Sequence, residues 1–266
     1  RSTLFPYTTL FRSPYSRHVR SLRFLAIIFS DEPALAPHVR YYQRLLARDE
    51  DEAHVLASRK AAELGVVGVM DEMLIPALTL AGQFRAQDEI TAEDFEFILE
   101  STAEIVGQVR ARQKAVPPEG VGRVLVLSVH APADRLVLEM LCTAVAAAGH
   151  SIDVVPQDLS IEATLSALIG TSADLNCIVA VSQTRGAEAR NYCRRLRAAH
   201  PDAKLLVLRP LPDGSDTARS VARMKEAGAD YVVTSIRQAL REIESLLGQE
   251  PEKPGPIAVR AEPAEA

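Results

Sequence analysis

The sequence predicts an α/β protein in which a small four-helix bundle precedes a five-stranded parallel sheet. Three observations support this expectation. Apolar residues recur at helical spacing between 37 and 114. A Pro-Pro-Glu-Gly break follows at 117–120. Beyond it, short β-branched runs alternate with amphipathic stretches, which is typical of a flavodoxin-like fold with helices on both faces of its sheet.

The first two expected helices are set by their end signals. Pro37 suits the first turn of a helix, because its missing N–H is not needed there. Asp49 or Asp51 can cap the next helix, which we expect to stop at Gly65. The run Asp49 to Glu52 is therefore interpreted as capping and not as a metal site, since negative charge at a helix start also suits the helix dipole.

Two more helices complete the expected bundle. The third carries apolar residues from Met70 to Phe84, and Pro76 should break or kink it. The fourth opens on Thr91 and Asp94, a pair that resembles a capping box, and keeps its three-four apolar spacing for about four turns.

The expected strands are apolar and do not alternate, which favours burial on both faces. They are the runs 124–127, 152–155, 177–181, 205–208 and 231–233. The expected organisation is a probable sequencing artefact at 1–13, a lead-in at 14–30, the bundle at 31–115, the α/β domain at 121–248 and a flexible Pro/Ala/Glu-rich tail at 249–266.

Composition limits the classes of function. The 266-residue chain carries a net charge of −5, which gives no reason to expect nucleic acid as a partner. Aromatic residues make up only 5% and tryptophan is absent, so a stacking platform for bases is not expected. Cys142, Cys177 and Cys193 match no zinc spacing, and we expect buried thiols in a reducing compartment.

The first candidate site follows the first strand, because ligands of open parallel sheets bind at the carboxyl ends of the strands. Ser128, His130 and Ala133 occupy the positions of the Asp-x-His-x-x-Gly motif, in which the histidine ligates cobalt. With the bundle in front, the chain resembles cobalamin-binding modules of methionine synthase and of light-responsive regulators. The aspartate and glycine are replaced, and Ser160 matches the later Ser-x-Leu element only loosely.

Because the motif is degenerate, the sequence predicts no cofactor, and cobalamin is the alternative. His130 would then be an ordinary strand-end histidine that bonds to loop backbone. The second candidate is the loop after the third strand, where Ser182, Thr184, Arg185 and Gly186 could bind a small anion at a helix N-terminus or simply cap that helix.

Three further segments carry a different resemblance. Asp31–Leu35, Tyr42–Leu46 and the stretch from Asp71 to Leu78 resemble the cytoplasmic extension of permeases in the autoinducer-2 exporter family. The resemblance covers about 17–247 and implies a non-catalytic accessory domain that senses a ligand or partner, at the cytoplasmic face of the bacterial inner membrane.

The partner implied by this resemblance is a membrane-embedded permease domain that the chain lacks. Arg17, Arg20 and Arg23 would then lie near anionic lipid, and the prediction leaves room for a homo-oligomer. No nucleophile with a base and no pair of carboxylates stands out, so we expect no enzyme. The alternative function is a corrinoid-binding sensor or methyltransferase subunit.

Overall fold

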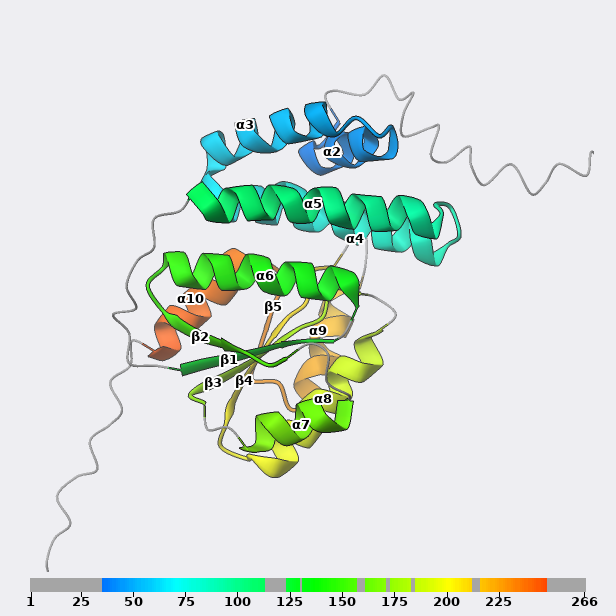
Figure 1. The fold of residues 1–266 in the computed structure, drawn as a ribbon. Coiled ribbons are helices and arrows are strands. Elements are labelled where there is room, and N and C mark those ends of the chain that lie inside the picture. The colour runs from blue at the N-terminus through cyan, green and yellow to red at the C-terminus, as the bar shows by residue number, and fades with distance from the viewer. Residues whose placement is uncertain are drawn as a thin grey trace, which may run out of the picture.

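A computed structural model describes residues 35–112, 123–129, 131–156, 161–170, 173–182, 185–211 and 216–247. The chain folds into stacked layers (Figure 1). The N-terminal helices lie on α6 and α10, these two helices cover one face of the sheet, and α7, α8 and α9 cover the other. The predicted fold class, a helical bundle followed by a flavodoxin-like parallel sheet, is confirmed.

The bundle helices begin where the sequence signals them. They are α2 (Pro37–Leu46), α3 (Glu50–Val69), α4 (Ile75–Ala86) and α5 (Ala92–Arg112). Asp49 caps α3 by accepting a hydrogen bond from the backbone N–H of Glu52. Thr91 and Asp94 form the expected capping box at the start of α5, with each side chain accepting from the backbone N–H of the other.

The predicted helix end at Gly65 is confirmed. Gly65 has non-helical backbone angles, with φ of +73°, so α3 consists of two helical pieces that meet at Gly65, and the second piece continues to Val69. A π-helical turn, η2 (Met70–Leu74), then leads directly into α4. Pro76 lies in the first turn of α4, where it needs no N–H partner, so it does not break the helix.

This helical run, Glu50–Ala86, is the one stretch of the described residues that is long and apolar enough to cross a bilayer by length and composition. In the structure 56% of its most apolar window is buried. A mostly buried core helix passes the same test, and the run comprises α3, η2 and α4 of the bundle.

The sheet has the order β2-β1-β3-β4-β5, and all its pairings are parallel. Each expected strand is present within a few residues of its predicted bounds. The strands are β1 (Arg123–Ser128), β2 (Ser151–Val154), β3 (Leu175–Val179), β4 (Lys204–Leu208) and β5 (Tyr231–Val233). The helices between and after them are α6 (Pro132–Ala147), α7 (Ile161–Gly170), α8 (Gly186–Ala199), α9 (Thr217–Glu226) and α10 (Ile236–Leu247).

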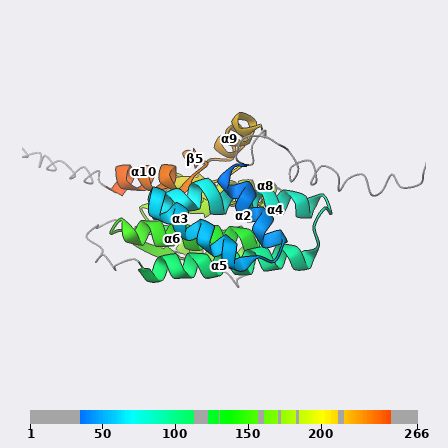
Figure 2. The same ribbon diagram turned by 90° about the horizontal axis from the view of Figure 1, so that it is seen from above.

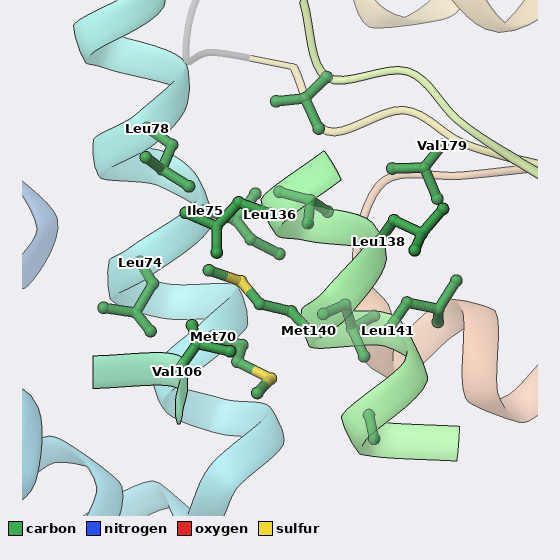
Figure 3. Packing of buried hydrophobic residues seen from close by; sticks show 14 of the residues in the cluster. Met70, Leu74, Ile75, Leu78, Val106, Leu136, Leu138, Met140, Leu141 and Val179 are labelled. Carbon is green, nitrogen blue, oxygen red and sulfur yellow. The ribbon is translucent and has the colours of Figure 1, made fainter. Parts of the chain in front are cut away.

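One hydrophobic core joins the bundle to the α/β domain. Ile75 and Met70 of the bundle lie beside Leu136 and Met140 of α6 (Figure 3). From above, the bundle helices lie over α6, and α10 runs beside α3 (Figure 2). A second core lies between the other face of the sheet and α7, α8 and α9.

A polar contact fixes the same interface. Asp71 in η2 accepts hydrogen bonds from the backbone N–H groups of Ile236 (2.7 Å) and Arg237 (2.9 Å). A bundle carboxylate therefore caps α10 from 165 residues away in sequence. Burial raises the pKa of Asp71, although the two backbone hydrogen bonds and Arg237 act against that rise.

Several other expectations have definite outcomes. The three cysteines are free; Cys177 and Cys193 are buried and Cys142 is half-buried. Arg197 in α8 donates to the carbonyls of Pro201, Ala203 and Gly228. The segments 1–13, 14–30, 116–120 and 249–266 lie outside the described residues, as do Arg17, Arg20 and Arg23.

Candidate functional site

The order of the strands places a switch point between β1 and β3. The chain leaves β1 toward β2 on one side and later adds β3 on the other side. The loops that follow β1 and β3 therefore diverge, and a crevice forms between them at the carboxyl edge of the sheet. This edge also faces the bundle, because α4 lies above the start of α6.

A cavity of about 300 Å³ occupies this position between the bundle and the sheet edge. Thr79, Gly82, Gln83 and Gln87 line it from α4 and the turn that follows. Ala131, Ala133, Val181 and Ser182 line it from the ends of β1 and β3. The cavity lies at the lower end of the size range of small-molecule sites. Its sheet side is mostly small and apolar, and its bundle side combines apolar groups with amides and the guanidinium of Arg85.

Two of the sequence-predicted site residues meet at this cavity. Ala133, in the first turn of α6, and Ser182, after β3, both line it. Ser128 is the last residue of β1 and is buried, with 1% of its surface exposed, but it does not line the cavity. The predicted loops after β1 and β3 are thus adjacent in space.

The remaining predicted residues have other positions or are not described. Arg185 precedes α8 and forms an ion pair with Glu188 at 2.8 Å. Gly186 is the first residue of α8 and is buried. His130, Ser160 and Thr184 lie outside the described residues, so their predicted roles stay predictions.

Sequence reasoning missed Asp134, the most buried carboxylate at this edge. Its side chain is fully buried. One oxygen, Oδ1, accepts from the backbone N–H groups of Val181 (2.7 Å) and Ser182 (2.9 Å), and Oδ2 accepts from that of Ala131 (3.3 Å). Burial raises the pKa of Asp134, while these three hydrogen bonds and the nearby Arg185 lower it. Its position in the first turn after Pro132 is a signal only for a helix start.

Arg209, which follows β4, was missed for a similar reason. Its side chain is only 6% exposed, and its Nη1 donates to the carbonyl oxygens of Ala180 (3.1 Å) and Ser182 (3.5 Å). Its Nε donates to the hydroxyl of Ser220 at 3.0 Å. Burial lowers the pKa of Arg209, the charge of Asp134 raises it, and Arg190 lowers it further. An arginine after a strand gives no sequence signal for burial, because arginine is mostly exposed in proteins.

The described residues contain no group of three or more His, Cys, Asp or Glu side chains that could hold a metal ion.

Comparisons with known proteins find solved structures of similar fold. No family model matches the chain, and no curated protein matches it. Among solved structures, the monomethylamine corrinoid protein of Methanosarcina barkeri is similar, with a TM-score of 0.55 and 13% identity over 79% of this chain and 98% of that chain.

Two other structures are also similar. A cobalamin-binding protein of Desulfitobacterium hafniense DCB-2 has a TM-score of 0.38 and 12% identity, over 79% of this chain and 98% of that chain. The methanol:cobalamin methyltransferase complex of M. barkeri has a TM-score of 0.38 and 11% identity, over 91% and 95%. At 13% identity the first match establishes the fold alone, and the other two superpose too loosely to add to it.

Proposed function

We propose that this chain is a corrinoid-binding protein and that the corrinoid occupies the cavity between α4 and the carboxyl ends of β1 and β3. The observation that supports this most directly is the position of the cavity, at the switch point and beneath the bundle. The M. barkeri corrinoid protein shares the fold. This function was the alternative in the sequence analysis, and it now has more support than a permease extension.

The described residues fit a flat ligand with an apolar face and a hydrogen-bonding rim. Ala131 and Ala133 present methyl groups from the sheet side, while Gln83 and Gln87 offer amides from the bundle side. A β-carbon built on Gly82 meets no atom within 4 Å, so the bundle wall is open at that point. A corrin ring brings its own equatorial nitrogen ligands for cobalt, so it does not need a cluster of metal-binding side chains.

His130 is the residue proposed to ligate the cobalt, on the strength of its place in the sequence motif. The chemistry supplied by a bound corrinoid is the transfer of a methyl group through cobalt. In this proposal the chain's own residues bind and shield the group and do not catalyse the transfer, in keeping with the absence of an acid–base pair among the predicted site residues.

Filling the cavity tests the proposal. Gly82→Leu should abolish binding of hydroxocobalamin, because the new side chain enters the open space. Gly107→Leu is the matched control: Gly107 also lies inside a bundle helix with nothing within 4 Å of a built β-carbon, but it does not line the cavity. Both changes replace glycine with a better helix former, so both proteins should fold.

The measurement is the absorption spectrum of the purified protein after incubation with hydroxocobalamin and desalting. Wild type and Gly107→Leu should retain the corrinoid, and Gly82→Leu should not. His130→Ala should alter the spectrum of the bound complex. Failure of the wild-type protein to retain any corrinoid would overturn the proposal, whereas an unchanged spectrum in His130→Ala would overturn only the role of His130.

The permease partner, the contact of Arg17, Arg20 and Arg23 with lipid, and the membrane-associated location stay predictions. None of the three similar structures described above is named as part of a transporter. A chain of this fold that contained only the described elements would bind and present a ligand and would not itself form a transport pathway.

A further inference from the structure

The segment Ala180–Ser182 forms the part of the cavity wall that follows β3. Val181 and Ser182 line the cavity directly, and Ala180 leads into them from the strand. Short segments after a strand are usually free to adopt more than one path, because regular ladder bonds end there. This segment is held on both sides by buried charged groups.

The first of these groups is the carboxylate of Asp134, which accepts the N–H groups of Val181 and Ser182 on one oxygen. Its second oxygen accepts the N–H of Ala131, which also lines the cavity. A single fully buried side chain therefore joins the end of β1 to the end of β3 across the switch point.

The second group is the guanidinium of Arg209, which donates to the carbonyl oxygens of Ala180 and Ser182. The guanidinium is packed closely: a β-carbon at Gly186 would lie 3.0 Å from Nη2 of Arg209. A side chain at position 186 would therefore crowd the guanidinium. Ser220 holds the side chain from α9 through the bond to Nε.

The two charges lie at opposite ends of one peptide group, the one that joins Ala180 to Val181. Its N–H donates to the carboxylate of Asp134 and its carbonyl oxygen accepts from the guanidinium of Arg209, so its dipole is aligned between the two charges. No ion pair joins Asp134 to Arg209 directly among the described residues, but the carboxylate raises the pKa of Arg209 against the effect of burial. If this peptide group were turned over, its carbonyl oxygen would face the carboxylate of Asp134 and its N–H would face the guanidinium of Arg209, and both contacts would be repulsive.

We infer that Asp134 and Arg209 are positioning residues that fix the Ala180–Ser182 wall, so that the cavity keeps one shape for its ligand. The identity of that ligand rests on the proposed function, but the positioning itself does not. The arrangement assigns a role to two residues outside the degenerate motif.

Backbone hydrogen exchange of the ligand-free protein, read by NMR, tests the positioning directly. In Asp134→Ala the amides of Val181 and Ser182 should exchange at least about 10-fold faster than in wild type, since each loses its acceptor. In Asp134→Asn the side chain keeps one carbonyl oxygen. Either the amide of Ala131 or the amides of Val181 and Ser182 should therefore exchange faster, but not all three. It also serves where the alanine variant fails to fold.

Asp230→Ala is the matched control, because Asp230 accepts the backbone N–H of Leu205 (2.8 Å) at the opposite end of the sheet. It should accelerate exchange at Leu205 and leave Val181 and Ser182 unchanged. Unchanged exchange of Val181 and Ser182 in both Asp134 variants would overturn the inference.

Binding of hydroxocobalamin distinguishes a positioning role from a merely structural role, which would leave binding unchanged. Asp134→Asn should weaken binding about 10-fold or more, because a displaced wall no longer matches the ligand, while Asp230→Ala should bind like wild type. Arg209→Met should weaken binding similarly, and the double variant should lose less than the sum of the two.

The two proposals fail in different ways. If wild type retains no corrinoid, the proposed function is wrong and the exchange experiment still decides the positioning. If wild type binds and Asp134→Asn binds equally well with faster exchange at its wall, the positioning role is wrong and the function stands.

Discussion

We expect the carboxylate of Asp71 to be a main polar contribution to the stability of the contact between the bundle and the α/β domain. Replacing Asp71 with alanine removes the acceptor of two backbone N–H groups at the start of α10. An N-cap contributes about 0.5–2 kcal/mol, and a hydrogen bond to a charged group about 1.5–3 kcal/mol. Water can replace part of this at a half-buried site, so we expect a loss of about 2 kcal/mol in the free energy of unfolding.

For a protein of this size a loss of about 2 kcal/mol lowers the Tm by about 4–8 °C. The assay is urea and thermal unfolding followed by circular dichroism. Asp71→Asn keeps one carbonyl oxygen and should lose roughly half as much. Glu72→Ala, the adjacent exposed residue, is the control and should change stability by less than about 0.5 kcal/mol.

Asp216→Ala provides a second comparison, because Asp216 caps α9 through a single local bond to the N–H of Arg219. It should cost about 1 kcal/mol. If Asp71→Ala were no more destabilising than Asp216→Ala, the idea that this carboxylate connects the two parts of the molecule would be refuted.

Two further predictions concern stability. Arg197→Ala should lower the free energy of unfolding by about 2 kcal/mol, because Arg197 donates to three carbonyl oxygens and to Asp230. Arg195→Ala, at an exposed position of the same helix, should lower it little. Equal losses of the two variants in denaturant unfolding would contradict the role of Arg197. Leu74→Ala should cost about 3 kcal/mol in the same assay, because Leu74 is fully buried in the core of the bundle. Val55→Ala, at a residue that is 60% exposed, should stay within about 0.5 kcal/mol of wild type. A small loss at Leu74 would contradict a tightly packed core at this position.

The parts of the fold that the sequence predicts correctly are those with local causes. Thr91 and Asp94 lie three residues apart and bond to each other, so their spacing alone identifies the start of α5. The strands are also predicted from local pattern, because a short apolar run between helical stretches has few other uses in an α/β protein. The order of the strands comes from the structure alone.

The errors and omissions have non-local causes. Asp71 bonds to residues 165 and 166 positions away, and Asp134 to residues 47 and 48 positions away. No spacing rule connects such pairs. The cavity wall on α4 was missed for the same reason, since only the packing of the bundle on the sheet brings Gln83 to the edge.

The two ends of the sheet arrange charged side chains in different ways. At the amino end, Arg197 and the exposed Asp230 form a direct ion pair at 2.7 Å, and both also bond to backbone groups. At the carboxyl end, Asp134 and Arg209 are kept apart by the peptide groups of one loop.

This difference bears on why the carboxyl end carries such charges at all. Replacing buried ionic groups with apolar residues of similar volume is often neutral or stabilising, so stability alone does not explain them. An apolar side chain can fill the same space, but it cannot choose between two orientations of a peptide group. Asp134 and Arg209 together select one orientation, at the one edge of the sheet where the described residues enclose a cavity beneath the bundle. A wall fixed in this way can meet a rigid, flat ligand without first being ordered by it, which removes part of the entropy loss on binding.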